Sequence, residues 1–544
     1  MLDLKSKNIL LVEDYPAMRK AIRDTLYSLE VESLVEAENG FKAIAAMQTH
    51  KFDIVLCDYN LGAGKNGLQV LEESRLRKLL PSDAAFIMVT GEQVQSMVLS
   101  AMDNKPDEYL TKPFTAQLLL TRLERTFKRK SFFKQVDAAI NDENYALAIK
   151  YCDKLLADNP GKLRTAALKK RAELAIYVQD YSTAQQIYQD ILNQRELNWA
   201  MLGLAQIQCL QGHSEDAIRI FLEIIDKYPM TLEAYDLLAQ SYELTDQHTE
   251  AQATLHKAIT LAPQTILRQR KLATIANKTG DLEIAESACK SVVELGKYSI
   301  HKHASDFSNL AQVLNQSEKT DDALAILQSM RTEFPNDPST ALRAAIYEAD
   351  IFKSRGDTEK AEAAFTEALE LTQQHRQDLD KEILLEMSKA CYLNKQESIA
   401  DKLLEQLIKN HIDDDEFINN INAMQCTIGY ENHAEELIHT TKKQLIHINN
   451  EGVKLYQQGH FTAAVELFAT AFKSMPNNKT IILNMTKIML HAIQDVGCTE
   501  KNMTEAKYYI NKAQKLGVAP YKLNAIQMEY AKLALSFKNS LKKD

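Results

Sequence analysis

The chain has 544 residues, of which 45% are hydrophobic and 25% charged, a composition typical of a folded protein with more than one core. Its net charge of -10 argues against a nucleic-acid partner, because neutralising phosphates requires a basic face. No apolar stretch is long enough to span a bilayer, and the first apolar run stops at Glu13, so we expect a cytoplasmic protein without membrane insertion. The seven cysteines form no CxxC pair, which indicates reduced, structural thiols.

Short apolar runs alternate with amphipathic stretches over residues 1–128. The runs cover 9–12, 33–35, 54–57, 86–89 and 108–110, and the helices are predicted over 18–29, 41–47, 68–79, 93–102 and from Thr115. Continuous apolar strands separated by helices are typical of a parallel sheet that is covered on both faces. We therefore predict an α/β doubly wound domain with a five-stranded parallel sheet.

Polar residues follow these strands at the sheet edge where such folds place their chemistry. Glu13 and Asp14 follow the first strand, Asp58 the third, Thr90 the fourth and Lys112 the fifth. A single strand-end aspartate would usually be structural, but five such residues in this order indicate a common site. Three converging carboxylates repel one another unless a cation neutralises them, and oxygen-only ligation suits Mg²⁺. The sequence predicts an acidic, phosphoryl-accepting pocket.

The expected roles follow from phosphoryl transfer, in which a protein mainly positions groups and neutralises charge. Asp58 is the predicted nucleophile and phosphoacceptor. Glu13 and Asp14 would hold the metal together with Asp58. The Lys112 ammonium and the Thr90 hydroxyl would each contact a phosphoryl oxygen.

These motifs resemble those of the CheY-like receiver superfamily over about residues 7–128. The motifs are Glu13-Asp14, Asp58, Thr90-Gly91 and Lys112-Pro113. The resemblance implies the strand order 2-1-3-4-5, a sensor histidine kinase as phosphodonor, Mg²⁺ as cofactor and a cis Lys112-Pro113 peptide. It also implies that the Asn60 backbone carbonyl is a metal ligand.

The same resemblance assigns switching and hydrolysis roles. It makes Tyr109 the aromatic switch residue, which turns inward when Thr90 moves towards the phosphate. It makes Asn60 and Glu92 the pair that tunes dephosphorylation, as in chemotaxis-type receivers. The loop after Asp58 departs from the family because it lacks the usual proline and is one residue longer than common.

From about Phe132 onward the sequence contains only amphipathic helices, and a small residue recurs at a period of about 34 residues. The recurring residues are Ala148, Ala184, Ala217, Ala251, Ala285, Ala323, Ala361, Ala400, Ala434, Ala464 and Ala506. This register resembles the tetratricopeptide repeat (TPR). We predict a receiver over 1–128 and, over 129–544, an all-α TPR superhelix (α-solenoid) of about ten to eleven helix pairs. The repeats around Ala434 and Ala506 are the most degenerate.

The TPR resemblance also places particular side chains in the groove of the superhelix, where a partner would bind. They are Trp199, Leu202, Gln206 and Leu210 in the third repeat and Glu233, Asp236, Gln240 and Glu243 in the fourth. No proline or glycine occurs between Pro113 and Pro160, so we expect an almost rigid joint between the two domains.

The combined architecture resembles the VieB type of receiver-TPR protein. It implies a phosphorylation-dependent response regulator that is not an enzyme. The only catalysis that it implies is self-catalysed phosphoryl acceptance and autodephosphorylation at Asp58. The expected partners are a sensor histidine kinase and a protein ligand of the TPR groove, itself a kinase or another response regulator; a homodimer is possible. One alternative is a phosphate sink or inhibitor of another kinase and regulator pair, with the repeats serving only for docking. A transcription factor or enzyme is a second alternative, against which the absence of a helix-turn-helix, cyclase or phosphodiesterase motif argues.

Overall fold

The computed structural model describes residues 3–91, 99–100, 103–158, 161, 163–376, 378–518 and 520–540. The chain forms two compact units, Met1–Ile326 and Leu327–Asp544. Most of the helix predicted over 93–102 lies outside the described residues, and so does Glu92. Along the described parts of the chain, no helix is both long and apolar enough to cross a membrane.

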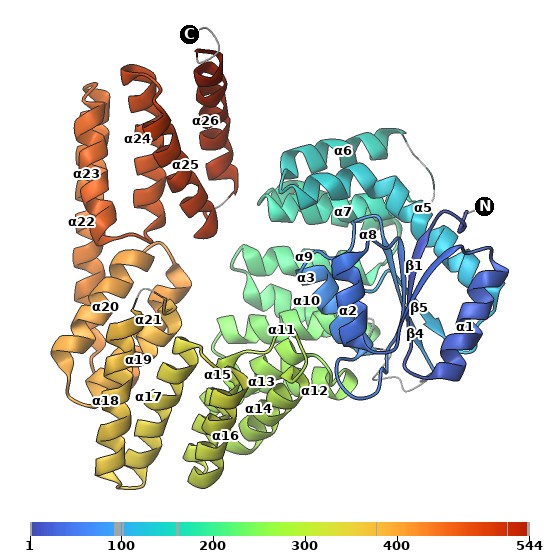
Figure 1. Ribbon diagram of the computed structural model, residues 1–544, viewed down its shortest axis with the longest axis horizontal. Coiled ribbons are helices and arrows are strands. Elements are labelled where there is room, and N and C mark those ends of the chain that lie inside the picture. Colours follow the sequence, from blue (N-terminus) through green and yellow to red (C-terminus); the bar gives the residue numbers. More distant parts are fainter. Residues whose placement is uncertain are drawn as a thin grey trace. The chain divides into compact units, whose positions relative to one another are not determined.

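The first unit begins with the predicted parallel sheet (Figure 1). Its strands are β1 (Asn8–Val12), β2 (Ser33–Ala37), β3 (Ile54–Asp58), β4 (Ala85–Thr90) and β5 (Glu108–Thr111). All pairings are parallel and the order is β2-β1-β3-β4-β5, which confirms the expected topology. Every residue of β3 and β4 is buried, and this explains why their sequences read as continuous apolar runs.

Helices cover both faces of this sheet. One face packs against α2 (Gly40–Thr49) and α3 (Gly67–Leu76), and the other against α1 (Pro16–Ser28) and the first half of α5 (Ala116–Asn141). The helix predicted over 68–79 is shorter in the structure. It ends at Leu76 because Lys78 adopts a left-handed backbone conformation with φ of 52°, which no helix can include.

Helix α5 continues without interruption through residue 128, where we placed the domain boundary. Thr115 caps its first turn by accepting a hydrogen bond from the Leu118 amide. Its first half buries Leu119 and Leu123 against the sheet, and its second half buries Phe133 and Val136 against α6. One helix therefore serves as both the last helix of the receiver and the first helix of the repeats.

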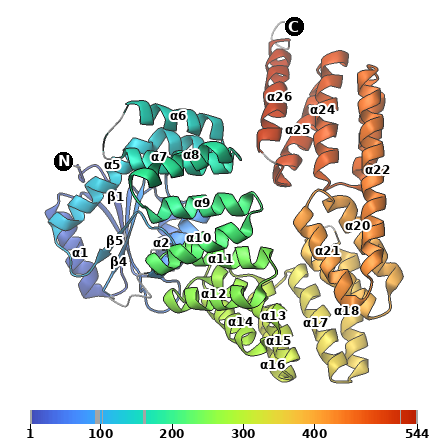
Figure 2. The ribbon, with the colours of Figure 1, turned by 180° about the vertical axis from the view of Figure 1, so that it is seen from behind.

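Helices follow one another in pairs through the rest of the first unit (Figure 2). They are α6 (Tyr145–Asp158), α7 (Arg164–Tyr177), α8 (Tyr181–Gln194), α9 (Asn198–Leu210), α10 (Ser214–Lys227), α11 (Leu232–Leu244), α12 (His248–Leu261), α13 (Ile266–Thr279), α14 (Leu282–Gly296) and α15 (Ala304–Gln316). The next helix, α16 (Thr320–Glu333), begins in the first unit and ends in the second. The recurring alanines from Ala148 to Ala323 are all fully buried, which places them at the close helix contacts that the repeat register predicts.

The second unit continues the helical pattern around a large core, with a smaller separate cluster between its last three helices. Its helices are α17 (Pro338–Ser354), α18 (Thr358–His375), α19 (Lys381–Leu393), α20 (Glu397–His411), α21 (Asp415–Ile428), α22 (Glu431–Gln457), α23 (Phe461–Ser474), α24 (Lys479–Val496), α25 (Glu500–Lys515) and α26 (Pro520–Ser540). The degenerate repeat around Ala434 differs from a regular TPR, because α22 runs uninterrupted through Ala434 and Gly452. A Cβ atom at Gly452 would lie 2.3 Å from the Phe468 ring, so only glycine fits this position without a shift of the ring.

Candidate functional site

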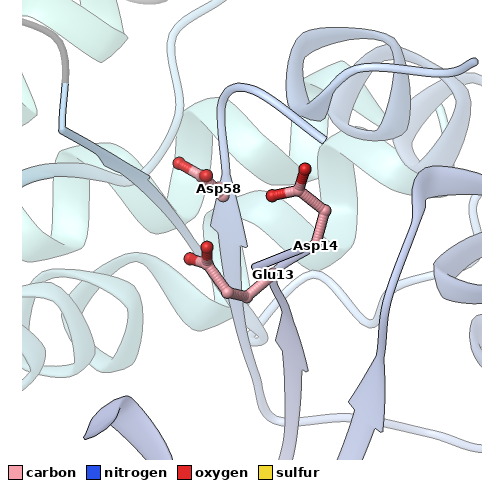
Figure 3. A group of neighbouring side chains, drawn as sticks. All are labelled: Glu13, Asp14 and Asp58. Atoms are coloured by element: carbon pink, nitrogen blue, oxygen red, sulfur yellow. The ribbon is translucent and has the colours of Figure 1, made fainter. Parts of the chain in front are cut away.

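Three carboxylates meet at the carboxyl edge of the sheet. Glu13 and Asp14 follow β1, and Asp58 is the last residue of β3. Figure 3 shows their carboxylate groups gathered around one space, and an oxygen of each lies within 4.8 Å of the others. Glu13 and Asp58 are buried, whereas Asp14 is exposed, so the cluster is open to solvent on the Asp14 side. It is the only such group of potential metal ligands within the described ranges.

Lys112 completes this cluster from the end of β5. Its Nζ lies 2.5 Å from Glu13 Oε2 and 3.0 Å from Asp58 Oδ2. The Lys112-Pro113 peptide is cis, as the family resemblance implies. Three carboxylates and one ammonium leave two negative charges, which a single divalent cation would balance. The oxygen-only donors therefore fit Mg²⁺.

The environment of Asp58 shifts its acidity. Burial raises the pKa of the Asp58 carboxyl to about 6, and the nearby Lys112 ammonium opposes this rise while Glu13 adds to it. The carboxylate form is thus still favoured at neutral pH, although less strongly than for an exposed aspartate. An ionised, partly desolvated carboxylate is the form that a phosphoryl acceptor needs.

The loop from Asp58 to α3 passes close to the acidic cluster at two glycines. A Cβ atom at Gly67 would lie 2.1 Å from the Asp58 carbonyl oxygen, and a Cβ at Gly62 would lie 3.0 Å from Asp14 Oδ2. Gly62 also has a positive φ of 68°. Asn60 is exposed in this loop, directly after the buried Tyr59. The metal-ligand role of the Asn60 carbonyl stays a prediction.

Thr90 and Tyr109 occupy neighbouring strands. Thr90 ends β4, is buried and stands in register with Thr111 of β5. Tyr109 is half-buried and packs against the core on the α2 and α3 side of the sheet. The structure thus brings Glu13, Asp14, Asp58 and Lys112 into contact distance and places Thr90 at the same edge. The switch roles of Thr90 and Tyr109 stay predictions, and Glu92 lies outside the described residues.

One residue of the loop escaped sequence reasoning. Lys65 is only 6% exposed, and its Nζ lies 2.6 Å from Glu73 Oε2 and 2.5 Å from the Tyr298 carbonyl oxygen. A lysine in a glycine-rich loop is normally expected in solvent. No local pattern could reveal its burial, because Tyr298 is 233 positions away in the sequence.

Sequence models of two known families match separate parts of the chain. The sequence model of the response regulator receiver domain matches residues 9–124. Two tetratricopeptide repeat models match residues 199–229 and residues 232–265 and 348–375. The matched repeats coincide with α9–α10, α11–α12 and part of α17–α18.

Curated relatives resemble the N-terminal part. The chemotaxis protein CheY of Pseudomonas aeruginosa is 31% identical over 121 residues, which are 22% of this chain and 96% of that protein. The chemotaxis protein CheY-3 of Vibrio cholerae is 30% identical over 125 residues, 23% of this chain and 95% of that protein. The chain thus spans nearly the whole length of both relatives.

Solved structures resemble each part separately. The C-terminal part of a TPR repeat-containing protein from Cytophaga hutchinsonii is 17% identical with a TM-score of 0.36, covering 47% of this chain and 99% of that one. A CheY-like receiver domain protein from Methanospirillum hungatei is 24% identical with a TM-score of 0.21, covering 23% of this chain and 96% of that one. The sequence matches and the site geometry show that this chain belongs to the response regulator family, with a CheY-like receiver domain followed by tetratricopeptide repeats.

Proposed function

We propose that this chain is a phosphorylation-dependent response regulator that accepts a phosphoryl group on Asp58 from a sensor histidine kinase. Its output is a protein bound by the TPR region. The observation that supports this proposal most directly is the position of Lys112, whose ammonium lies within 3.0 Å of both Glu13 and Asp58 in an otherwise acidic pocket.

The proposed transfer uses groups at the carboxyl edge of the sheet. An Asp58 carboxylate oxygen attacks the phosphorus of a phosphohistidine, forming a P–O bond as the P–N bond breaks. The bonding pair stays on the imidazole nitrogen, which then takes up a proton from solvent. Lys112 pairs with a phosphoryl oxygen and Thr90 donates its hydroxyl to another, so negative charge is stabilised as it moves onto Asp58.

The acidic cluster also explains the proposed metal requirement. Glu13, Asp14 and Asp58 would hold Mg²⁺ with their side chains, and Asn60 with its backbone carbonyl. When bound, the ion would reduce the repulsion between the carboxylates and an incoming phosphoryl group. Glu13 and Asp58 are buried, so this repulsion is weakly screened by water.

The output is proposed to pass from the receiver to the repeats. Thr90 and Tyr109 would change position on phosphorylation, and Asn60 and Glu92 would set the rate of phosphate loss. The protein ligand of the groove is proposed to be a kinase or another response regulator. A phosphate sink is the rival function, and it predicts that phosphorylation leaves the affinity for this ligand unchanged.

Phosphorylation with a small donor tests the proposal on the full chain. Acetyl phosphate with Mg²⁺ should add one phosphoryl group, mapped to Asp58 by mass spectrometry, and EDTA should prevent it. Asp58→Asn should lose the label. Asp53→Asn is the matched control, because Asp53 precedes the same strand but bonds Lys7 and the Asn8 amide instead of the acidic cluster. Labelling that persists in Asp58→Asn or in EDTA would contradict the assignment.

A further inference from the structure

The receiver contacts the repeats at a second place besides α5, within the first compact unit. We propose that the faces of α11 and α13 and the carboxyl end of α14 form a receiver-docking surface, made of Glu233, Asp236, Thr265, Arg268, Leu295 and Tyr298. The unphosphorylated receiver occupies this surface, and phosphorylation releases it. The docking stands on the contacts themselves, whereas the release rests on the proposed phosphorylation of Asp58.

The first contact centres on Arg268 of α13. Its side chain is 2% exposed, and its guanidinium donates to both carboxylate oxygens of Asp236 at 2.8 and 2.7 Å. The same group donates to Asp103 Oδ2 of the receiver at 3.0 Å, and Thr265 Oγ1 lies 3.0 Å from that oxygen. A buried guanidinium that donates hydrogen bonds to one carboxylate from each domain makes a specific contact, because its planar donors fix the position of both partners.

The second contact caps a helix end. The last carbonyls of an α-helix have no donor within the helix and carry its partial negative charge. Gln69 Nε2 of the receiver donates to the Leu295 carbonyl near the end of α14 at 3.0 Å, and Lys65 Nζ donates to the Tyr298 carbonyl just beyond it at 2.5 Å. The Phe41 ring meets the Tyr298 ring edge-on, with centroids 5.8 Å apart. Receiver groups of the appropriate polarity thus satisfy this end of the repeat.

The docked receiver lies on positions expected to bind an external protein. Glu233 and Asp236 are predicted groove positions of the fourth repeat; Glu233 pairs with Lys105 at 3.6 Å and Asp236 is bonded to Arg268. Lys105 also forms part of the wall of a cavity of about 540 Å³ that is lined by Trp199 of the third repeat. A protein that uses these positions must therefore displace the receiver.

The receiver groups that donate hydrogen bonds to carbonyls at and just beyond the end of α14 lie in the loop and the first helical turn that follow Asp58. Lys65 precedes α3 in the loop that starts at Asp58, and Gln69 lies in the first turn of that helix. Gly67 packs against the Asp58 carbonyl, and its amide donates to the Tyr59 carbonyl at 2.9 Å. Lys65 and Gln69 are thus joined to Asp58 through one short loop, so a change of this loop on phosphorylation would shift their bonds to the Tyr298 and Leu295 carbonyls. We expect this shift to weaken the docking.

Zero-length carbodiimide cross-linking of the full chain tests both parts. The reagent joins an amine directly to a carboxylate, so the docked state should yield a Lys105–Glu233 amide, detected by mass spectrometry. The Lys227–Glu196 pair, 3.1 Å apart within the repeats, is the internal standard. Without phosphodonor, Asp103→Arg should reduce the Lys105–Glu233 product several-fold relative to the standard. Asp24→Arg, at an exposed position on α1, should leave it unchanged.

The docking of the receiver and its release on phosphorylation can each be overturned separately. If the standard forms but the Lys105–Glu233 product does not, or if Asp103→Arg leaves its yield unchanged, the docking is overturned. Beryllofluoride with Mg²⁺ should lower the product several-fold in the natural sequence and leave it unchanged in Asp58→Asn. An unchanged yield in a chain that acetyl phosphate labels at Asp58 would overturn the release. Absence of labelling would instead count against the proposed function, while the cross-link without phosphodonor still decides the docking.

Discussion

Lys112 Nζ lies 3.0 Å from Asp58 Oδ2, close enough to stabilise negative charge on that carboxylate and on a phosphoryl group attached to it. We expect Lys112→Ala to slow phosphorylation by acetyl phosphate about 10²–10³-fold, the usual effect of removing one preorganised donor. The phosphorylation rate of Lys112→Arg should be intermediate, because a guanidinium keeps the positive charge but not the shape of the ammonium. Lys51→Ala, at an exposed lysine, is the control. A rate for Lys112→Ala within twofold of the natural protein would show that Lys112 has no part in the transfer.

The second prediction concerns the close packing of Gly67 against Asp58. Gly67→Ala would place a Cβ atom 2.1 Å from the Asp58 carbonyl oxygen, so the backbone must shift. We expect the free energy of local unfolding of β3 to fall by about 1–3 kcal/mol, the usual cost of overpacking. Gly91→Ala should have little effect, since within the described residues no atom beyond those of its sequence neighbours lies within 4 Å of its Cβ position. Hydrogen exchange of peptides from β3 measures the difference, and equal exchange in both variants would contradict the packing argument.

Much of this molecule follows from local sequence pattern. The five apolar runs predicted the five strands, of which β3 and β4 are buried along their whole length and the edge strands β2 and β5 are partly exposed, and the residues after them predicted the acidic site. The alanine register likewise predicted the close helix contacts. These features depend on positions that are near one another in the sequence or equivalent in a repeated pattern.

Other features depend on tertiary contacts that no local pattern encodes. The docking of Asp103 on Arg268 joins residues 165 positions apart, and each would read as an ordinary surface charge. The fusion of two expected helices into α22 was equally hidden, because no proline or glycine pattern marks a missing turn. The end of α3 at Leu76 depends on a left-handed lysine, which sequence rarely predicts.

The third prediction concerns the pH dependence of the second unit. Burial lowers the pKa of His411 to about 4, and the charge of Lys381 adds to this effect. The folded state therefore keeps His411 neutral, while the unfolded state binds a proton near pH 6.5. Stability should be greatest above that pH and should fall as the pH drops towards 4, by up to about 3 kcal/mol.

His411→Gln isolates this contribution. The variant should show a flatter stability profile between pH 6.5 and 4 than the natural protein, measured by hydrogen exchange of peptides from α20 and α21. His439→Gln changes an exposed histidine of the same unit and should keep the natural slope. Parallel profiles for His411→Gln and the natural protein would mean that another group causes the acid sensitivity.

The last prediction concerns the path by which phosphorylation reaches the repeats. Helix α5 runs from Ala116 to Asn141, and Lys130 within it is held to the receiver by an ion pair with Asp107 at 2.9 Å. A flexible Gly/Ser segment inserted between Lys130 and Phe132 breaks the helix just beyond this attachment. If α5 carries the signal, the variant should bind its protein ligand but lose the effect of beryllofluoride on affinity, a roughly 5–150-fold change for coupling of about 1–3 kcal/mol.

The matched control carries the same insertion after Lys51, in an exposed turn between α2 and β3. It should keep the beryllofluoride response, because it leaves α5 and the docking contacts intact. If the response survives the α5 insertion but disappears in Asp103→Arg, the signal passes through the receiver-docking surface and not along the helix. If it survives both changes separately but not together, each route alone is sufficient. A response that persists when both are changed would show that neither contact carries the signal to the repeats.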